Sequence, residues 1–144
     1  MTTLLCGQVL RYSAMPFGTA PTDAAQVDSA GAVLIEDGRI ADVGPAQALK
    51  LAHPEAQVTE LGDALLMPGF IDAHAHYPQT GIIASWGKRL IDWLNTYTFP
   101  EEMRFGDPAY AAEIAALYLD LTAANGTTTV CSYCTIHPES VDAL

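Results

Sequence analysis

The chain has 144 residues, of which 17 are acidic and 6 are basic, so its net charge is -11; hydrophobic residues make up 50% of it. This composition excludes a disordered or fibrous protein, because there is enough apolar surface to offset the entropy of ordering the chain. The basic residues are scattered apart from the adjacent Lys88 and Arg89, so nucleic acid and anionic membranes are poor partners.

The cysteine content and the hydropathy pattern indicate a cytoplasmic protein. Cys6, Cys131 and Cys134 are an odd number and make a poor disulfide framework, which fits a reducing compartment. No stretch is apolar and uncharged for the roughly 18 residues that a membrane span requires. No basic residue precedes Arg11, as a signal peptide would require.

The first part of the chain, residues 1–64, carries short strand signals separated by turns. Strands are predicted over residues 4–12 and 57–61, and a brief helix over residues 46–51. A loop is predicted from three turn-forming residues, Pro16, Gly18 and Pro21. We therefore expect a small antiparallel sheet in this part.

A β-hairpin is the clearest local signal in that sheet. Asp37 and Gly38 lie between two apolar runs. Both residues tolerate the positive φ that a two-residue hairpin turn requires. The sequence therefore predicts a tight turn at these two positions.

From residue 65 onward the pattern becomes strand, helix, strand. A strand over residues 70–76 is apolar enough to be covered on both faces, and a β-branched strand is predicted over residues 127–136. Between them, a helix is predicted to start at Asp107 and to stop near Gly126. The apolar stripe of that helix is expected at Tyr110, Ile114, Leu117, Tyr118 and Leu121. An earlier helical spacing occurs at Leu90, Ile91, Leu94 and Tyr97. Alternating strands and helices predict parallel strands in an α/β architecture.

The last eight residues, 137–144, are typical of the opening turns of one more helix. They follow only two strands of the parallel type, and a parallel sheet needs more strands and helices to bury its apolar surface. A short helix that ends the protein is one interpretation. We favour the other, that the chain is the front part of a larger protein.

Two histidines at the end of a predicted strand form the strongest candidate site. Side chains alternate between the faces of a strand, so Asp72, His74 and His76 point the same way. Two imidazoles on one face, at the strand end where α/β barrels hold their active sites, can converge on one metal ion. We therefore predict a metal site at His74 and His76. Asp72 either orients an imidazole or is satisfied by backbone amides, and the sequence leaves both open.

The pair Cys131 and Cys134 is interpreted as structural. Positions three apart on a strand face opposite sides, and no second cysteine pair completes a four-sulfur site. We expect both cysteines to be buried and to act as small hydrophobes.

Side chains beyond His76 are candidates for contact with a planar ligand. Gln79 can donate and accept hydrogen bonds at once, which suits a heterocycle with adjacent donor and acceptor edges. Four aromatic residues could stack on such a ligand, but core packing is the preferred interpretation for most of them: Trp86, Trp93, Tyr97 and Phe99.

Five segments resemble a known protein family. Residues 67–76 closely resemble the first-strand motif of the amidohydrolase superfamily, and residues 33–44 resemble the β-hairpin of its small sandwich domain. More narrowly, residues 76–79, 93–101 and 125–129 resemble the guanine deaminase family within that superfamily. The resemblance covers essentially the whole chain.

The resemblance implies a fold and an activity. The fold is an α/β protein with the beginning of a (β/α)₈ metal-dependent hydrolase barrel, preceded by part of a small β-sandwich. Residues 1–64 would be the sandwich segment, and residues 65–144 the first two βα units of an incomplete barrel. The activity is the hydrolysis of guanine to xanthine and ammonia, and a homodimer is one assembly open to the full-length protein.

The resemblance also implies the role of individual residues. His74 and His76 would be two ligands of a Zn²⁺ ion. The purine pocket would be lined by His76, Tyr77, Pro78 and Gln79, with Gln79 hydrogen-bonding the base. Two further histidines, an aspartate, a catalytic glutamate and a purine-holding arginine belong to later strands, so no catalytic acid or base is assigned in this chain.

Two histidines fall short of the three protein ligands that are usual in catalytic zinc sites. We therefore predict that the chain as given does not deaminate guanine at a useful rate. Two other functions remain open. One is a non-catalytic small module that uses the histidines for structural metal binding or subunit contacts. The other is an amidohydrolase that acts on another aminated or halogenated heterocycle.

Overall fold

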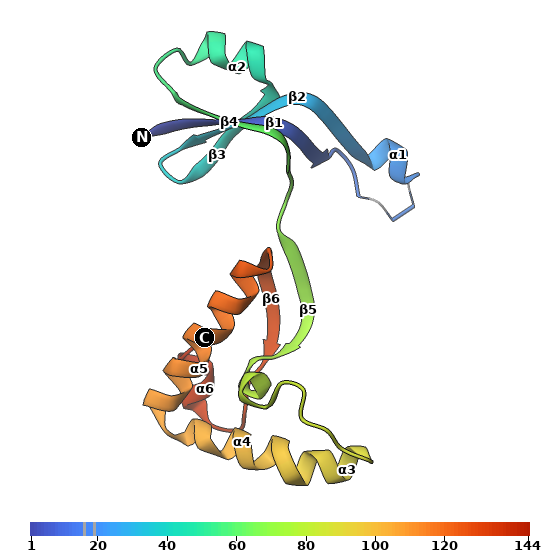
Figure 1. The fold of residues 1–144 in the computed structure, drawn as a ribbon, viewed down its shortest axis with the longest axis vertical. Coiled ribbons are helices and arrows are strands. Elements are labelled where there is room, and N and C mark those ends of the chain that lie inside the picture. Colours follow the sequence, from blue (N-terminus) through green and yellow to red (C-terminus); the bar gives the residue numbers. More distant parts are fainter. Residues whose placement is uncertain (16, 19) are drawn as a thin grey trace. The chain divides into compact units, whose positions relative to one another are not determined.

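The structure is a computed structural model that describes residues 1–15, 17–18 and 20–144. Pro16 of the predicted loop lies outside the described residues. The chain divides into two compact units, Met1–Pro68 and Gly69–Leu144. Both are visible in Figure 1.

The first unit is a four-stranded sheet in the order β3-β2-β1-β4. Its elements are β1 (Thr2–Tyr12), α1 (Pro21–Ala24), β2 (Ala25–Glu36), β3 (Arg39–Pro45), α2 (Ala46–Ala52) and β4 (Gln57–Leu66). Asp37 has φ 50° and Gly38 has φ 77°, and they join β2 to β3. The predicted hairpin turn is therefore confirmed.

The prediction of a wholly antiparallel sheet is wrong, because β4 pairs with β1 in parallel. Helix α2 carries the chain across one face of the sheet, so β4 starts from the same end as β1, whereas the β1–β2 and β2–β3 connections reverse the chain and give antiparallel neighbours. Strand β4 also extends beyond residue 61, with Leu65 opposite Gln8 and Leu66 opposite Val9. Gly62, with φ 60°, lies where the register of this strand pair shifts.

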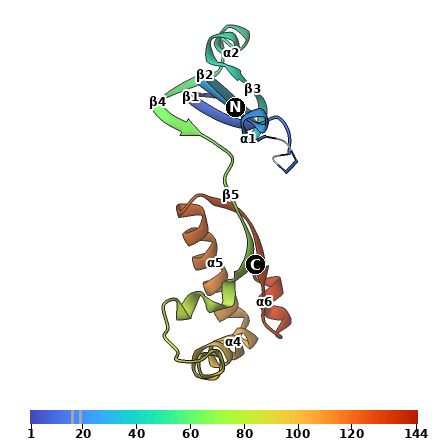
Figure 2. The same cartoon turned by 90° about the vertical axis from the view of Figure 1, so that its right-hand side faces the viewer.

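Helix α2 covers one face of this sheet (Figure 2). Leu49 packs on four buried residues of β1 and β2, which are Leu4, Cys6, Ala32 and Leu34. The opposite face carries an apolar groove of about 340 Å³, lined by residues that include Leu5, Val33 and Ile35.

The second unit is built around two parallel strands, β5 (Phe70–His76) and β6 (Thr127–Tyr133). The remaining elements are η1 (Tyr77–Ile82), α3 (Leu90–Trp93), the π-helical turn η2 (Leu94–Thr98), α4 (Phe99–Met103), η3 (Arg104–Gly106), α5 (Pro108–Ala124) and α6 (Pro138–Asp142). The parallel pairing and the mixed α/β character agree with the prediction, although β6 ends at Tyr133 rather than at residue 136.

Helix α5 has the predicted ends. The Asp107 carboxylate accepts a hydrogen bond from the Ala109 amide at 2.9 Å, and Gly126 has φ 80° just after the helix. The buried stripe is Ala111, Ile114, Ala115 and Tyr118. Leu117 and Leu121 of the predicted stripe are 46% and 42% exposed. The face that carries the small residues Ala111 and Ala115 packs on the core in their place.

The core of the second unit lies between α5, η1 and η3. Its buried members are Tyr77, Phe105, Ala111, Ile114, Ala115 and Tyr118. Strand β5 contributes only the partly buried Ala75, and its other residues are exposed. The prediction of a strand covered on both faces is therefore wrong for this chain, because β6 is the one strand that pairs with β5 among the described residues.

No helix within the described ranges is long and apolar enough to cross a membrane.

Candidate active site

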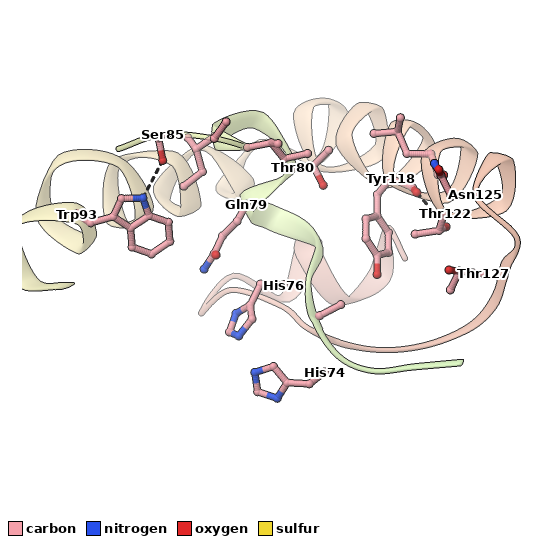
Figure 3. Close-up of a pocket in the computed structure, with 15 residues that line it drawn as sticks. His74, His76, Gln79, Thr80, Ser85, Trp93, Tyr118, Thr122, Asn125 and Thr127 are labelled. Carbon is pink, nitrogen blue, oxygen red and sulfur yellow. Dashed lines mark hydrogen bonds between the residues drawn. The ribbon is translucent and has the colours of Figure 1, made fainter. Parts of the chain in front are cut away.

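A cavity of about 520 Å³ lies beside β5 in the second unit. Its walls come from the end of β5, from the segment that follows, and from α5 (Figure 3). The lining of this cavity includes His74, His76, Gln79, Trp93 and Tyr118. The volume falls within the range of small-molecule sites, which is about 300–1,000 Å³.

The two histidines lie next to each other at the carboxyl end of β5. Their ring centroids are 5.3 Å apart and the rings meet edge to face. Tyr133, opposite His76 in the strand pairing, stacks on the His76 ring at 4.9 Å and lies 5.0 Å from the His74 ring. Sequence analysis missed Tyr133, although its position at the end of the neighbouring parallel strand was a usable signal.

This spacing suits two ligands of one zinc ion. Zinc binds imidazole nitrogen at about 2.0–2.1 Å, so the centroids of two tetrahedrally placed rings lie about 5 Å apart. Both rings are solvent-exposed, so a metal can reach them. The described residues contain no group of three or more His, Cys, Asp or Glu side chains arranged to hold a metal ion. The fit is therefore to part of a zinc site, with two donors.

Asp72 is engaged with the backbone. Its carboxylate accepts a hydrogen bond from the His74 amide at 3.1 Å. Of the two roles left open by the sequence, the backbone-satisfied carboxylate matches this contact. Through it, Asp72 restrains the backbone at His74 rather than the imidazole.

The turn η1 directly follows the histidines, and its side chains divide between the cavity and the core. Gln79 lines the cavity, whereas Tyr77 and Pro78 are fully buried and do not. The Tyr77 hydroxyl donates a hydrogen bond to the Ser140 carbonyl, and burial raises the pKa of Tyr77 to about 12. Of the four residues expected in the purine pocket, His76 and Gln79 are brought to the cavity, and Tyr77 and Pro78 pack in the core beneath it.

Two aromatic side chains form further parts of the cavity wall. Trp93 donates from its indole nitrogen to the Ser85 hydroxyl at 2.7 Å, so its ring is held beside Gln79 (Figure 3). The Tyr118 hydroxyl is buried and has no hydrogen-bond partner among the described residues. Burial, and next the charge of Asp72, raise the pKa of Tyr118. The expected core packing is confirmed for Tyr118, which also faces the cavity, whereas Trp93 lines the cavity and is not a member of the buried core.

The buried carboxylate of Glu101 lies against η1. Glu101 is 7% exposed, pairs with Arg104 at 2.9 Å and accepts a hydrogen bond from the Tyr110 hydroxyl. Burial, and then the hydrogen bond to Glu101, raise the pKa of Tyr110 to about 12. A β-carbon on Gly81 would lie 2.5 Å from a Glu101 carboxylate oxygen, so η1 and α4 meet here without room for a side chain.

The cysteines lie outside the cavity lining. All three thiols are free. Cys134 is partly buried against the core, but Cys131 is exposed, so the prediction of two buried cysteines is wrong for Cys131. The reason is again that one face of β6 has no covering layer among the described residues.

Sequence profiles place the chain in a family. The profile of the amidohydrolase family matches residues 65–144, which is more than half of the chain. A profile described as the imidazolonepropionase-like composite domain of bacteria matches residues 31–56. The chain therefore belongs to the amidohydrolase family.

Within this family, the chain is similar to individual guanine deaminases. The guanine deaminase of Escherichia coli K12 is 40% identical over 115 residues, which cover 79% of this chain and 26% of that protein. The crystal structure of guanine deaminase from Bradyrhizobium japonicum matches with a TM-score of 0.90 at 32% identity, covering 99% of this chain and 31% of that one. A guanine deaminase structure from C. acetobutylicum with bound guanine matches with a TM-score of 0.75 at 25% identity, over 99% of this chain and 32% of that one. The chain thus spans about a quarter to a third of the length of these relatives.

Proposed function

We propose that these residues serve the hydrolytic deamination of guanine to xanthine and ammonia, in the protein at the full length that its gene encodes. The observation that carries this proposal is that His74, His76 and Gln79 line one cavity. Two metal-binding imidazoles and an amide suited to a heterocycle edge are therefore available to the same ligand. The similarity to guanine deaminases supports the choice of substrate.

His74 and His76 would hold a zinc ion through their imidazole nitrogens. A zinc ion bound there supplies a Lewis acid and a water molecule of lowered pKa. Both rings are exposed on β5, so a zinc ion bound to them could take further ligands, as a catalytic zinc site requires. Tyr133 restricts the rotation of the His76 ring by stacking on it.

Gln79 would bind the purine edge and Trp93 would limit its position. An amide offers a donor and an acceptor side by side, as do the edges of guanine. The indole of Trp93, fixed by Ser85, supplies a flat apolar wall on which a purine can pack. These contacts orient the base, and the proton transfers to the leaving ammonia are proposed to use residues outside this chain.

We further propose that residues 1–64 contribute to a β-sandwich and residues 65–144 to the first two βα units of a (β/α)₈ barrel in a cytoplasmic enzyme. The parallel pairing of β5 with β6 across α5 supports the second assignment. On this proposal the 144 residues alone are inactive, because two imidazoles are fewer than the three protein ligands of a catalytic zinc site.

The test is guanine-dependent release of ammonia, measured on the full-length protein and on the 144-residue chain side by side. We expect turnover and about one zinc per chain for the full-length protein, and turnover at least about 1,000-fold lower for the short chain. In the full-length protein, His74→Ala should lower both zinc content and turnover. His53→Ala, a histidine of the first unit, is the matched control and should leave both unchanged.

A panel of aminated and chlorinated purines and triazines tests the substrate. Guanine should be the best substrate of the panel. Faster turnover of another heterocycle would overturn the assignment of guanine. Zinc binding by the full-length protein without hydrolysis of any member of the panel would favour a non-catalytic metal-binding role instead.

A further inference from the structure

A carboxylate outside the cavity lining contacts the amide that we propose to bind the purine. The Gln79 amide nitrogen donates a hydrogen bond to the Glu102 carboxylate at 3.3 Å, and both side chains are partly buried. Glu102 is on α4, and its contact crosses from that helix to η1. Figure 3 shows the Gln79 side chain directed into the cavity, between Trp93 and His76.

This contact decides which end of the Gln79 amide meets the carboxylate. An ionised carboxylate only accepts hydrogen bonds, so the NH₂ group must face Glu102. An amide without such a partner can turn over and present either end, because its two ends have nearly the same shape. No hydrogen bond to the Gln79 carbonyl oxygen is found in the described part of the chain, so this oxygen stays available to accept from a ligand.

The two elements that carry Gln79 and Glu102, η1 and α4, are both anchored by buried side chains. In η1, the side chains of Tyr77 and Pro78 are fully buried. In α4, the neighbouring Glu101 is buried and bound by Arg104 and Tyr110. Glu102 therefore meets Gln79 from a fixed backbone position.

We propose that Glu102 is a positioning residue that fixes the Gln79 amide with its carbonyl oxygen available to the cavity. The site then selects a heterocycle that presents an N–H group at that point. This inference rests on the proposed function, because it concerns how the same cavity orients guanine. Glu102 acts through Gln79 and is not proposed to touch the substrate.

Steady-state kinetics of the full-length protein with guanine test the inference. Glu102→Gln keeps the size of the side chain but lets the Gln79 amide turn over. We expect KM for guanine to rise about 5- to 20-fold, as for loss of a hydrogen bond to a charged group, with kcat within about 3-fold of wild type. Glu113→Gln, at an exposed glutamate of α5, is the matched control and should leave KM unchanged.

A double substitution separates positioning from a purely structural role. In a Gln79→Ala background there is no amide to orient, so adding Glu102→Gln should change KM by less than about 2-fold. If Glu102→Gln does not fold, Glu102→Asp takes its place, because it keeps the charge but shortens the reach. Its KM should rise in the wild-type background and stay unchanged in the Gln79→Ala background.

The outcomes distinguish this inference from the proposed function. Absence of guanine turnover by the wild-type full-length protein would overturn the proposed function and this inference together. Turnover by the wild type, with KM unaltered by the Glu102 substitutions, would overturn the inference alone. Equal increases of KM in the presence and absence of the Gln79 amide would do the same.

Discussion

The end of β5 and the turn η1 are adjacent in sequence but differ in how they are held. His74 and His76 are exposed, and their principal aromatic contact from another strand is Tyr133. In η1, the Tyr77 amide donates to the Ser132 hydroxyl at 3.0 Å, and the Thr80 hydroxyl donates to the Tyr77 carbonyl at 2.6 Å.

This difference separates the two halves of the proposed site. The half that would contact the purine is anchored within the described residues, because its turn rests on a buried core. The half that would bind the metal projects from a strand with one paired neighbour in the described part of the sheet. Substitutions should therefore affect stability strongly beneath η1 and weakly at the histidines.

The largest effect is expected for Phe105→Ala. Phe105 is fully buried and packs edge to face on both Tyr77 and Tyr110, so its loss should lower the free energy of unfolding by about 3–5 kcal/mol. Urea unfolding followed by tryptophan fluorescence measures this in the second unit, because Trp86 and Trp93 are the two tryptophans of the chain. Phe99→Ala, at a phenylalanine that is 48% exposed, is the control and should cost much less. Equal losses would contradict a core beneath η1.

A pH dependence is the next effect in size. The pKa of Tyr77 is about 12 in the folded chain, against 10.0 for the unperturbed group, because burial disfavours the charged form. The contribution of Tyr77 to stability is therefore fully present below pH 10 and is lost as the pH rises toward 12. A loss of about 2 kcal/mol follows, since one pKa unit corresponds to about 1.4 kcal/mol.

Urea unfolding at a series of pH values from 9 to 12 measures this loss. Other groups titrate in the same range, so the comparison that matters is with Tyr77→Phe, which lacks the ionising hydroxyl. The variant should lose less stability than the wild type over this range. Parallel curves for the two proteins would show that Tyr77 ionises as freely as an exposed tyrosine.

Below pH 9, Tyr77→Phe should itself be destabilising by about 1–2 kcal/mol. The substitution keeps the ring in the core but leaves the Ser140 carbonyl without the hydroxyl that donates to it. Thermal or urea unfolding measures the change. An unchanged stability would mean that solvent replaces the lost donor and that α6 is not held by this bond.

The smallest effect is expected at the histidines. In metal-free protein, His74→Ala combined with His76→Ala should change the free energy of unfolding by about 0.5 kcal/mol or less, because both side chains are exposed. Urea unfolding in the presence of a chelator measures this. A loss of more than about 2 kcal/mol would remove the contrast between the two halves of the site.

The sequence predicted those features that depend on neighbouring residues. The turn at Asp37, the cap at Asp107 and the strand that ends at His76 each follow from a few adjacent side chains, and each is confirmed. The sequence did not predict the parallel pairing of β1 with β4, because the residues of these two strands do not indicate the path that α2 takes across the sheet. The exposure of β5 and Cys131 was also missed, since an apolar run looks the same whether or not a second layer covers it.

For the candidate site, period-two alternation placed His74 and His76 on one face, and their adjacent rings agree with that. The contributions of Tyr118, Tyr133 and Glu102 were not predicted. Each depends on a contact between segments far apart in the chain, and no local spacing encodes such a contact. Tyr77 lies outside the cavity lining for the related reason that a turn sends consecutive side chains in different directions.

Gly81 limits how this cavity can be redesigned. A β-carbon there would lie 2.5 Å from a Glu101 carboxylate oxygen, which Arg104 and Tyr110 hold in place, so a larger residue would require this charged cluster to shift. A protein engineer who wished to admit a different heterocycle would leave η1 untouched and vary Ile83, which lines the same cavity and is exposed. The glycine thus lies near the end of η1, where the constrained turn gives way to the exposed Ile83.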